Sequence, residues 1–83
     1  MVHYQTRNSY DAEIEVGEII RDTLNVEVDD EKHLIYISYS RETHEGNLHN
    51  RIIDTVPNNS DINKINASYG NSILKISIPK NRA

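Results

Sequence analysis

The chain has 83 residues, a formal net charge of −4 at pH 7 and no cysteine. This length allows one domain with a modest core, and the absence of cysteine excludes disulfides, thiolate zinc sites and cysteine nucleophiles. An acidic chain without a stripe of Lys and Arg is a poor partner for nucleic acid, because phosphate neutralisation supplies most non-specific affinity. There is no signal-peptide core and no run of membrane-spanning length, so we expect a cytoplasmic protein that does not bind membranes.

The first half of the chain predicts strands separated by short connections. Residues 1–9 are polar and aperiodic, which predicts a short flexible N-terminal arm. Apolar residues alternate with acidic or polar ones over 10–16 and again over 24–28, the pattern of strands with one solvent face. A connector at 17–23 joins them. Residues 33–40 are apolar on both faces, as in a strand that lies between two layers or at a covered surface.

The second half continues in the same way. Residues 41–50 read as a loop, or as a loop plus a frayed extension of the strand at 51–56. The alternation over 65–69 and 73–78 predicts a hairpin around the turn at 70–72.

No window has helical periodicity, and short strands with closely spaced turns predict an all-β fold, an immunoglobulin-like antiparallel β-sandwich. We therefore expect one domain over residues 10–80, with 81–83 as the C-terminal end.

Residues that carry chemistry form no convincing site. His44 and His49 superficially fit the H-E-x-x-H zinc motif, but the second histidine comes one residue late and Gly46 lies between them in a predicted loop. Acidic pairs such as Asp29-Asp30 fall on turns, whereas catalytic carboxylates need a pocket that separates their pKa values. We predict no catalytic residue, no metal site and no cofactor, and so no enzyme.

The C-terminal stretch VPNNSDINKINASYGNSILKISIPK, residues 56–80, resembles the α-crystallin domain of small heat shock proteins, also called HSP20-like. That family reads L-P-x-x-V-D-x-x-x-I-x-A, then N-G-V-L, then alternating apolar residues into P-K. The matching positions here are Val56-Pro57, Asp61, Ile65, Ala67, Asn71, Ile73-Leu74 and Pro79-Lys80. Upstream, LIYISYSRE is similar to the family segment L-x-I-S-G-x-R through Ile35, Ile37, Ser38 and Arg41. The similarity covers about residues 10–80.

The chain also departs from the family pattern. Ser72 replaces the turn glycine, at a cost of roughly 1 kcal/mol if φ is positive there, unless Gly70 lets the turn reshape. The strand at 51–56 is one residue longer than in the family, which predicts a bulge. The segment 41–50 is too short to swap a strand into a partner, and neither a long N-terminal arm nor an I-x-I tail is present. We therefore expect a monomer or homodimer rather than a large oligomer.

The resemblance implies an ATP-independent chaperone (holdase) of the stress response. Its partners would be unfolded or extended polypeptide segments, bound at edge strands and apolar grooves. The family's usual acceptor groove would lie here between residues 34–40 and 65–69. The candidate groove residues are Ile35, Ile37, Ile65, Ala67 and Tyr69, with core filling as the alternative interpretation. The alternative function is a non-chaperone interaction or assembly module, such as an accessory domain of a gas-vesicle protein or arsenical-pump ATPase, or a p23-like co-chaperone.

Overall fold

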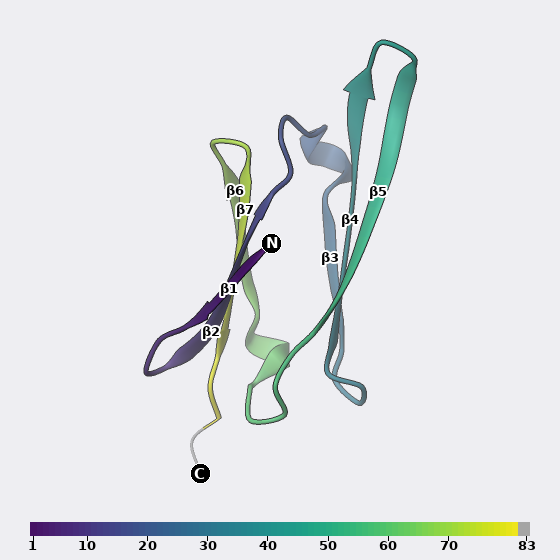
Figure 1. Ribbon diagram of the computed structural model, residues 1–83. Coiled ribbons are helices and arrows are strands. Elements are labelled where there is room, and N and C mark those ends of the chain that lie inside the picture. The colour runs from purple at the N-terminus through teal and green to yellow at the C-terminus, as the bar shows by residue number, and fades with distance from the viewer. Residues whose placement is uncertain (82–83) are drawn as a thin grey trace.

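Two antiparallel sheets pack face to face over residues 1–81, the part of the chain that the computed structural model describes (Figure 1). The first sheet has the order β1-β2-β7-β6, formed by β1 (Val2–Gln5), β2 (Ser9–Glu15), β7 (Ile73–Pro79) and β6 (Asn66–Gly70). The second has the order β3-β4-β5, formed by β3 (Asn25–Asp29), β4 (Leu34–Thr43) and β5 (Gly46–Thr55). Two short 3₁₀ helices, η1 (Arg21–Thr23) and η2 (Ile62–Lys64), lie in the connections. The predicted β-sandwich is confirmed.

The core lies between the sheets and is almost entirely aliphatic. Alternate residues of each strand point inward, as the two-residue period of a strand requires. The buried apolar residues are Ala12, Ile14, Val16, Ile35, Ile37, Tyr39, Val56, Ile62, Leu74, Ile76 and Ile78. Among them Ile37 on β4 and Leu74 on β7 are the most enclosed, at 1% and 0% exposed. Strand β4, which is apolar on both faces, buries one face in this core. On its outer face Tyr36 is half-buried, with the Arg51 guanidinium 5.5 Å from its ring centroid.

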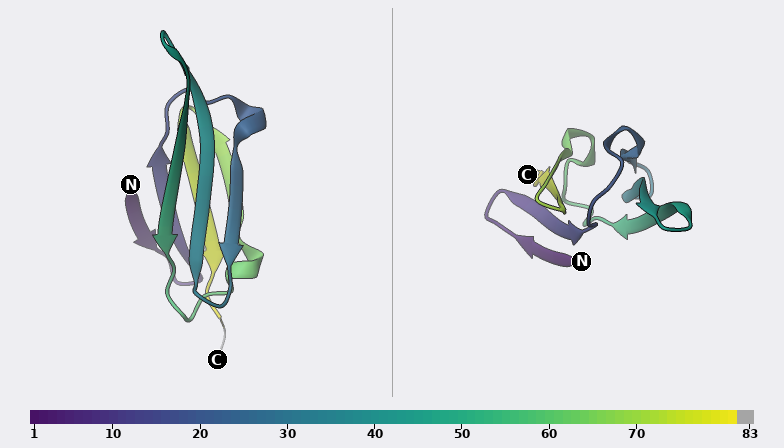
Figure 2. Two further views of the ribbon diagram at one scale, coloured as in Figure 1. Left: turned by 90° about the vertical axis from the view of Figure 1, so that its right-hand side faces the viewer. Right: turned by 90° about the horizontal axis from the view of Figure 1, so that it is seen from above.

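The β4–β5 hairpin is longer than the sequence pattern indicates. Its ladder pairs Leu34 with Thr55 at one end and Thr43 with Gly46 at the other, so that most of the predicted loop at 41–50 is strand. The register is continuous, and the predicted bulge in β5 is therefore wrong. The outer part of the hairpin extends beyond the rest of the sandwich (Figures 1 and 2). Main-chain pairing holds it there, without the buried apolar face that makes a strand visible in a sequence.

The N-terminal residues also differ from the prediction of a flexible arm. Val2–Gln5 form β1, which pairs with β2 although all four of its residues are exposed. The turn between them is fixed by the Thr6 hydroxyl, whose oxygen accepts hydrogen bonds from the main-chain N–H groups of Asn8 (3.2 Å) and Ser9 (3.1 Å). At the other end of the chain Lys80 bridges to Ser60, while Arg82 and Ala83 lie outside the described residues.

The β6–β7 turn has the strain that the sequence suggested. Asn71 and Ser72 have φ values of 51° and 66°, as in a type I′ hairpin turn, and Gly70 does not take up a positive φ in their place. The Ser72 carbonyl accepts hydrogen bonds from the main-chain N–H groups of Val16 (3.0 Å) and Gly17 (3.1 Å). The strained residue therefore anchors the end of β2.

We expect Ser72→Gly to raise the free energy of unfolding by about 0.5–1 kcal/mol, because glycine adopts a positive φ without the Cβ clash. The carbonyl that holds Val16 and Gly17 is kept. Ser68→Gly, in the extended backbone of β6, is the matched control and should lower stability by a similar amount. Urea unfolding of both variants measures the difference, and a Ser72→Gly protein no more stable than the parent would contradict the assigned strain.

Candidate functional site

The sandwich has two open sides, where the edge strands of one sheet meet those of the other. Figure 2 shows β3 lying alongside β6 on one side and β1 alongside β5 on the other. Hydrogen bonds connect the same pairs of edges. The Asn63 amide donates to the Asp30 carboxylate (3.3 Å) on the β3–β6 side, and His3 pairs with Asp54 (2.7 Å) on the β1–β5 side. Each side exposes main-chain groups that have no strand to pair with.

The β3–β6 side is lined by half-buried apolar residues. They are Leu24, Val26 and Val28 around β3, and Ile65 and Tyr69 around β6. Val26 and Val28 point inward, since they pair with the core residues Ile37 and Ile35. Ala67 also faces inward, yet it is exposed because its small side chain does not reach across to β3. This side therefore offers aliphatic surface next to two free strand edges.

The five residues predicted from the sequence do not lie on one surface. Ile35 and Ile37 are core residues, 3% and 1% exposed, on the central strand of their sheet. Ile65, Ala67 and Tyr69 do lie along the β6 edge. The strand that faces them is β3, with its inward residues Val26 and Val28, which the sequence prediction did not include. Their alternation was visible in the sequence, but the order of strands within a sheet was not.

Tyr69 has a structural function at one end of this side. Its hydroxyl donates to the Gly17 carbonyl (2.7 Å) and accepts from the main-chain N–H of Ile19 (3.4 Å). The Arg21 guanidinium lies 5.0 Å from its ring centroid. These contacts tie β6 to the connector that leads into β3. Tyr69 therefore links the β6 edge to the chain segment that precedes β3.

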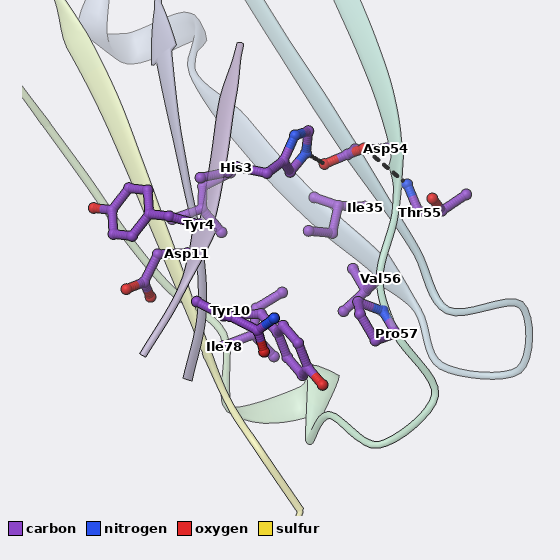
Figure 3. Close-up of a pocket in the computed structure, with 13 residues that line it drawn as sticks. His3, Tyr4, Tyr10, Asp11, Ile35, Asp54, Thr55, Val56, Pro57 and Ile78 are labelled. Carbon is purple, nitrogen blue, oxygen red and sulfur yellow. Dashed lines mark hydrogen bonds and ion pairs between the residues drawn. The ribbon is translucent and has the colours of Figure 1, made fainter. Parts of the chain in front are cut away.

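The β1–β5 side contains an opening of about 590 Å³ (Figure 3). Its apolar walls come from both sheets and include Ala12, Ile35, Val56, Ile76 and Ile78. Across its mouth the His3 Nε2 lies 2.7 Å from the Asp54 Oδ2. The other carboxylate oxygen of Asp54 accepts a hydrogen bond from the main-chain N–H of Thr55 (3.0 Å). Sequence reasoning named neither His3 nor Asp54.

The outer edge of β5 is the longest free edge of the molecule. The strand has ten residues and pairs only on its β4 side. Along it Leu48 and Ile53 are exposed, at 45% and 57%. The N–H of Val56 points toward β4, where it bonds to His33, so the preceding Thr55 N–H points to the free edge. The Asp54 carboxylate accepts a hydrogen bond from that N–H, so the free edge of β5 ends there on its C-terminal side.

The titratable side chains that are described are dispersed. Residues 1–81 contain no group of three or more His, Cys, Asp or Glu side chains able to hold a metal ion. His44 is exposed, and His49 contacts the buried Ser40 hydroxyl through its Nδ1 (2.5 Å). The Glu13 carboxylate, through hydrogen bonding and charge, raises the pKa of Tyr4. No helix in this part of the chain is long and apolar enough to cross a membrane.

Two sheets of four and three strands in this order, with apolar residues at free edges, define a sandwich of the small heat shock type. The model of the Hsp20/alpha crystallin family matches residues 2–83, and the chain belongs to that family. A search of curated protein sequences gave no match.

Solved structures of small heat shock proteins share the fold. HSP18.5 from E. histolytica is 19% identical with a TM-score of 0.85, and the match covers 98% of this chain and 86% of that one. A small heat-shock protein from Xylella fastidiosa, whose crystal structure is described as revealing a distinct high order structure, is 23% identical with a TM-score of 0.80. The match covers 99% of this chain and 84% of that one. Stress-induced protein 1 from Caenorhabditis elegans is 17% identical with a TM-score of 0.72, covering 99% and 88%.

We expect Tyr69→Phe to lower the free energy of unfolding by about 1 kcal/mol, because it removes the bond to Gly17 and leaves the Ile19 N–H without its acceptor. Tyr36→Phe is the control, since the Tyr36 hydroxyl forms no hydrogen bond among the described residues. Chemical denaturation of the two variants gives the comparison. Equal losses would show that the Tyr69 hydroxyl does not stabilise the link between β6 and the connector.

Proposed function

We propose that this domain is a holdase that binds unfolded or extended polypeptide segments without ATP and performs no chemistry on them. The observation that carries the proposal is the β3–β6 side, where two free strand edges border half-buried aliphatic side chains. An extended segment laid there gains main-chain hydrogen bonds and inserts alternate side chains between the sheets. Membership of the Hsp20/alpha crystallin family supports the same function.

Of the residues first considered, Ile65, Ala67 and Tyr69 stay in the proposed binding surface, together with Val26 and Val28. Ile35 and Ile37 lie beneath it as core, where their burial supports the edge strands. Each aliphatic side chain that a client buries here contributes roughly 1.5–3 kcal/mol at most. Two such contacts, reduced by the cost of ordering the client, correspond to weak and reversible binding, as a holdase requires.

The test is light scattering of a heat-aggregating client without ATP, comparing Ala67→Glu with Ser68→Glu. Both residues are exposed neighbours on β6, but only Ala67 faces the other sheet. We expect the unmodified domain and Ser68→Glu to suppress aggregation equally. Ala67→Glu should need about tenfold more protein, because a docked segment would bury its carboxylate unpaired. Equal suppression by both variants, or none by the parent, would contradict the proposal.

The free edge of β5 favours a second kind of contact, between two copies of the chain. We propose a homodimer in which the two β5 edges pair antiparallel, since a self-complementary edge meets itself across a twofold axis. The exposed Leu48 and Ile53 lie on this strand. Such a pairing would also serve the alternative function of an assembly module, in which a partner's strand replaces the second copy.

Arg51→Pro tests this contact, with Arg51→Ala as its control. Both lose the side chain that stacks on Tyr36, but only proline removes the Arg51 N–H, which points to the free edge. We expect sedimentation to give a dimer for the parent and for Arg51→Ala, and a monomer for Arg51→Pro. A parent that is monomeric at every concentration tested, or a Pro variant that still dimerises, would exclude this pairing.

A further inference from the structure

The β1–β5 opening is separate from the side proposed above for clients. Its volume of about 590 Å³ falls within the range of roughly 300–1,000 Å³ that is usual for binding pockets. The walls are mainly aliphatic, and Val56 and Ile78 are among the core residues that it reaches (Figure 3). It therefore has room for a few apolar side chains of a ligand, without any change in the β3–β6 side.

Asp54 places a carboxylate on the inner face of β5, where the pattern of the strand calls for an apolar residue. It pairs in register with the core residue Ile35, and Ile52 precedes it on the same face. Its side chain is 21% exposed. A carboxylate largely removed from water is costly unless it is paired, so the partner of Asp54 decides how stable this arrangement is.

The partner of Asp54, His3, is weakly anchored. His3 is 56% exposed and lies on β1, a four-residue strand with no buried side chain. A histidine carries a full charge only when it is protonated, whereas lysine and arginine carry one throughout the neutral range. A basic side chain that reached the opening would therefore form a stronger ion pair with Asp54 than His3 does.

The surroundings favour a peptide over a small amine as the source of that charge. Strand β1 is a sheet edge, and its outward main-chain groups border the opening. An extended peptide can satisfy these groups, but a small amine cannot. The chain as a whole carries a net charge of −4, so a cationic segment is attracted to it.

From this geometry we infer that the β1–β5 opening binds an extended polypeptide segment with an aliphatic side chain followed by a lysine or arginine. The aliphatic group packs against Val56 and Ile78, and the basic group takes the place of His3 at Asp54. The site does not depend on the β3–β6 side or on holdase activity. It gives this domain a selectivity for the sequence of the bound segment that apolar contacts alone do not provide.

The experiment is a titration of the whole chain with three acetylated, amidated peptides, followed by NMR amide shifts. The probes are Ser-Ile-Ser-Lys-Ser, its Glu-for-Lys counterpart and its Gly-for-Ile counterpart. We expect the first to bind at least about tenfold more tightly than the second, as a charged hydrogen bond implies. The amides that shift should belong to β1 and to residues 54–56, and the Gly-for-Ile peptide should bind more weakly than the first.

Three variants complete the test. Asp54→Asn keeps an acceptor for the Thr55 N–H but removes the charge, and should abolish the preference for Lys over Glu. Glu15→Gln, which removes an exposed charge at the far end of β2, should leave it unchanged. His3→Ala should tighten binding of the Lys peptide severalfold, because the competing partner is lost.

Shifts confined to β3 and β6, or equal affinity for the Lys and Glu peptides, would overturn the inference and leave the holdase proposal standing. If the domain fails to suppress aggregation but still prefers the Lys peptide, the holdase proposal is contradicted and this inference stands.

Discussion

Everything in this structure depends on two sheets held together by a buried core whose described side chains are aliphatic except for Tyr39. The centre is closed by Ile37 and Leu74, one from each sheet. Isoleucine suits strands because its branched Cβ is stiff and packs well on a pleated surface. Its side chain is short, however, and the residues at the edges do not reach across the gap. The openings on both sides follow directly from this composition.

Four free strand edges would promote aggregation in a protein that had no features to prevent edge-to-edge pairing. Three of them are kept short here, since β1, β3 and β6 have four or five residues each. The fourth, β5, is long, but Asp54 occupies the last outward N–H of the strand. The surfaces proposed for binding are therefore the same ones that would otherwise lead to aggregation. The length of each edge and the charges along it decide whether binding or aggregation occurs.

The sequence predicted those parts of the fold in which one face of a strand is buried. Alternation identified β2, β3 and the β6–β7 hairpin, and the double-faced run identified β4. Strand β1 and the outer half of the β4–β5 hairpin were not predicted as strands, because a strand exposed on both faces has no apolar period. The strain at Ser72 was foreseen from a missing glycine, since backbone conformation at a turn is a local property.

The candidate sites could be predicted less well, and the reason is topological. Ile65 and Tyr69 were predicted to lie on one strand of the surface proposed here, but Val26 and Val28 were not paired with them. The order of strands in a sheet decides which edges face each other, and a pattern of period two contains no information on that order.

The contact between His3 and Asp54 could not be predicted from the sequence for a related reason. They are 51 positions apart, and each on its own is an ordinary polar residue. Only the fold shows that Asp54 points inward, and that the side chain covering it belongs to the least buried strand.

The two open sides differ in chemistry, and this difference bears on how one small domain could treat different segments. On the β3–β6 side the ends are closed by neutral donors, the Tyr69 hydroxyl and the Asn63 amide. On the β1–β5 side the mouth is closed by the contact between the His3 imidazole and the Asp54 carboxylate. A segment that carries only aliphatic residues gains nothing from displacing His3, because Asp54 would be left unpaired. Such a segment is directed to the β3–β6 side, while one that also carries a basic residue can use either. Placing one carboxylate on the inner face of an edge strand is thus enough to make two similar openings selective for different sequences.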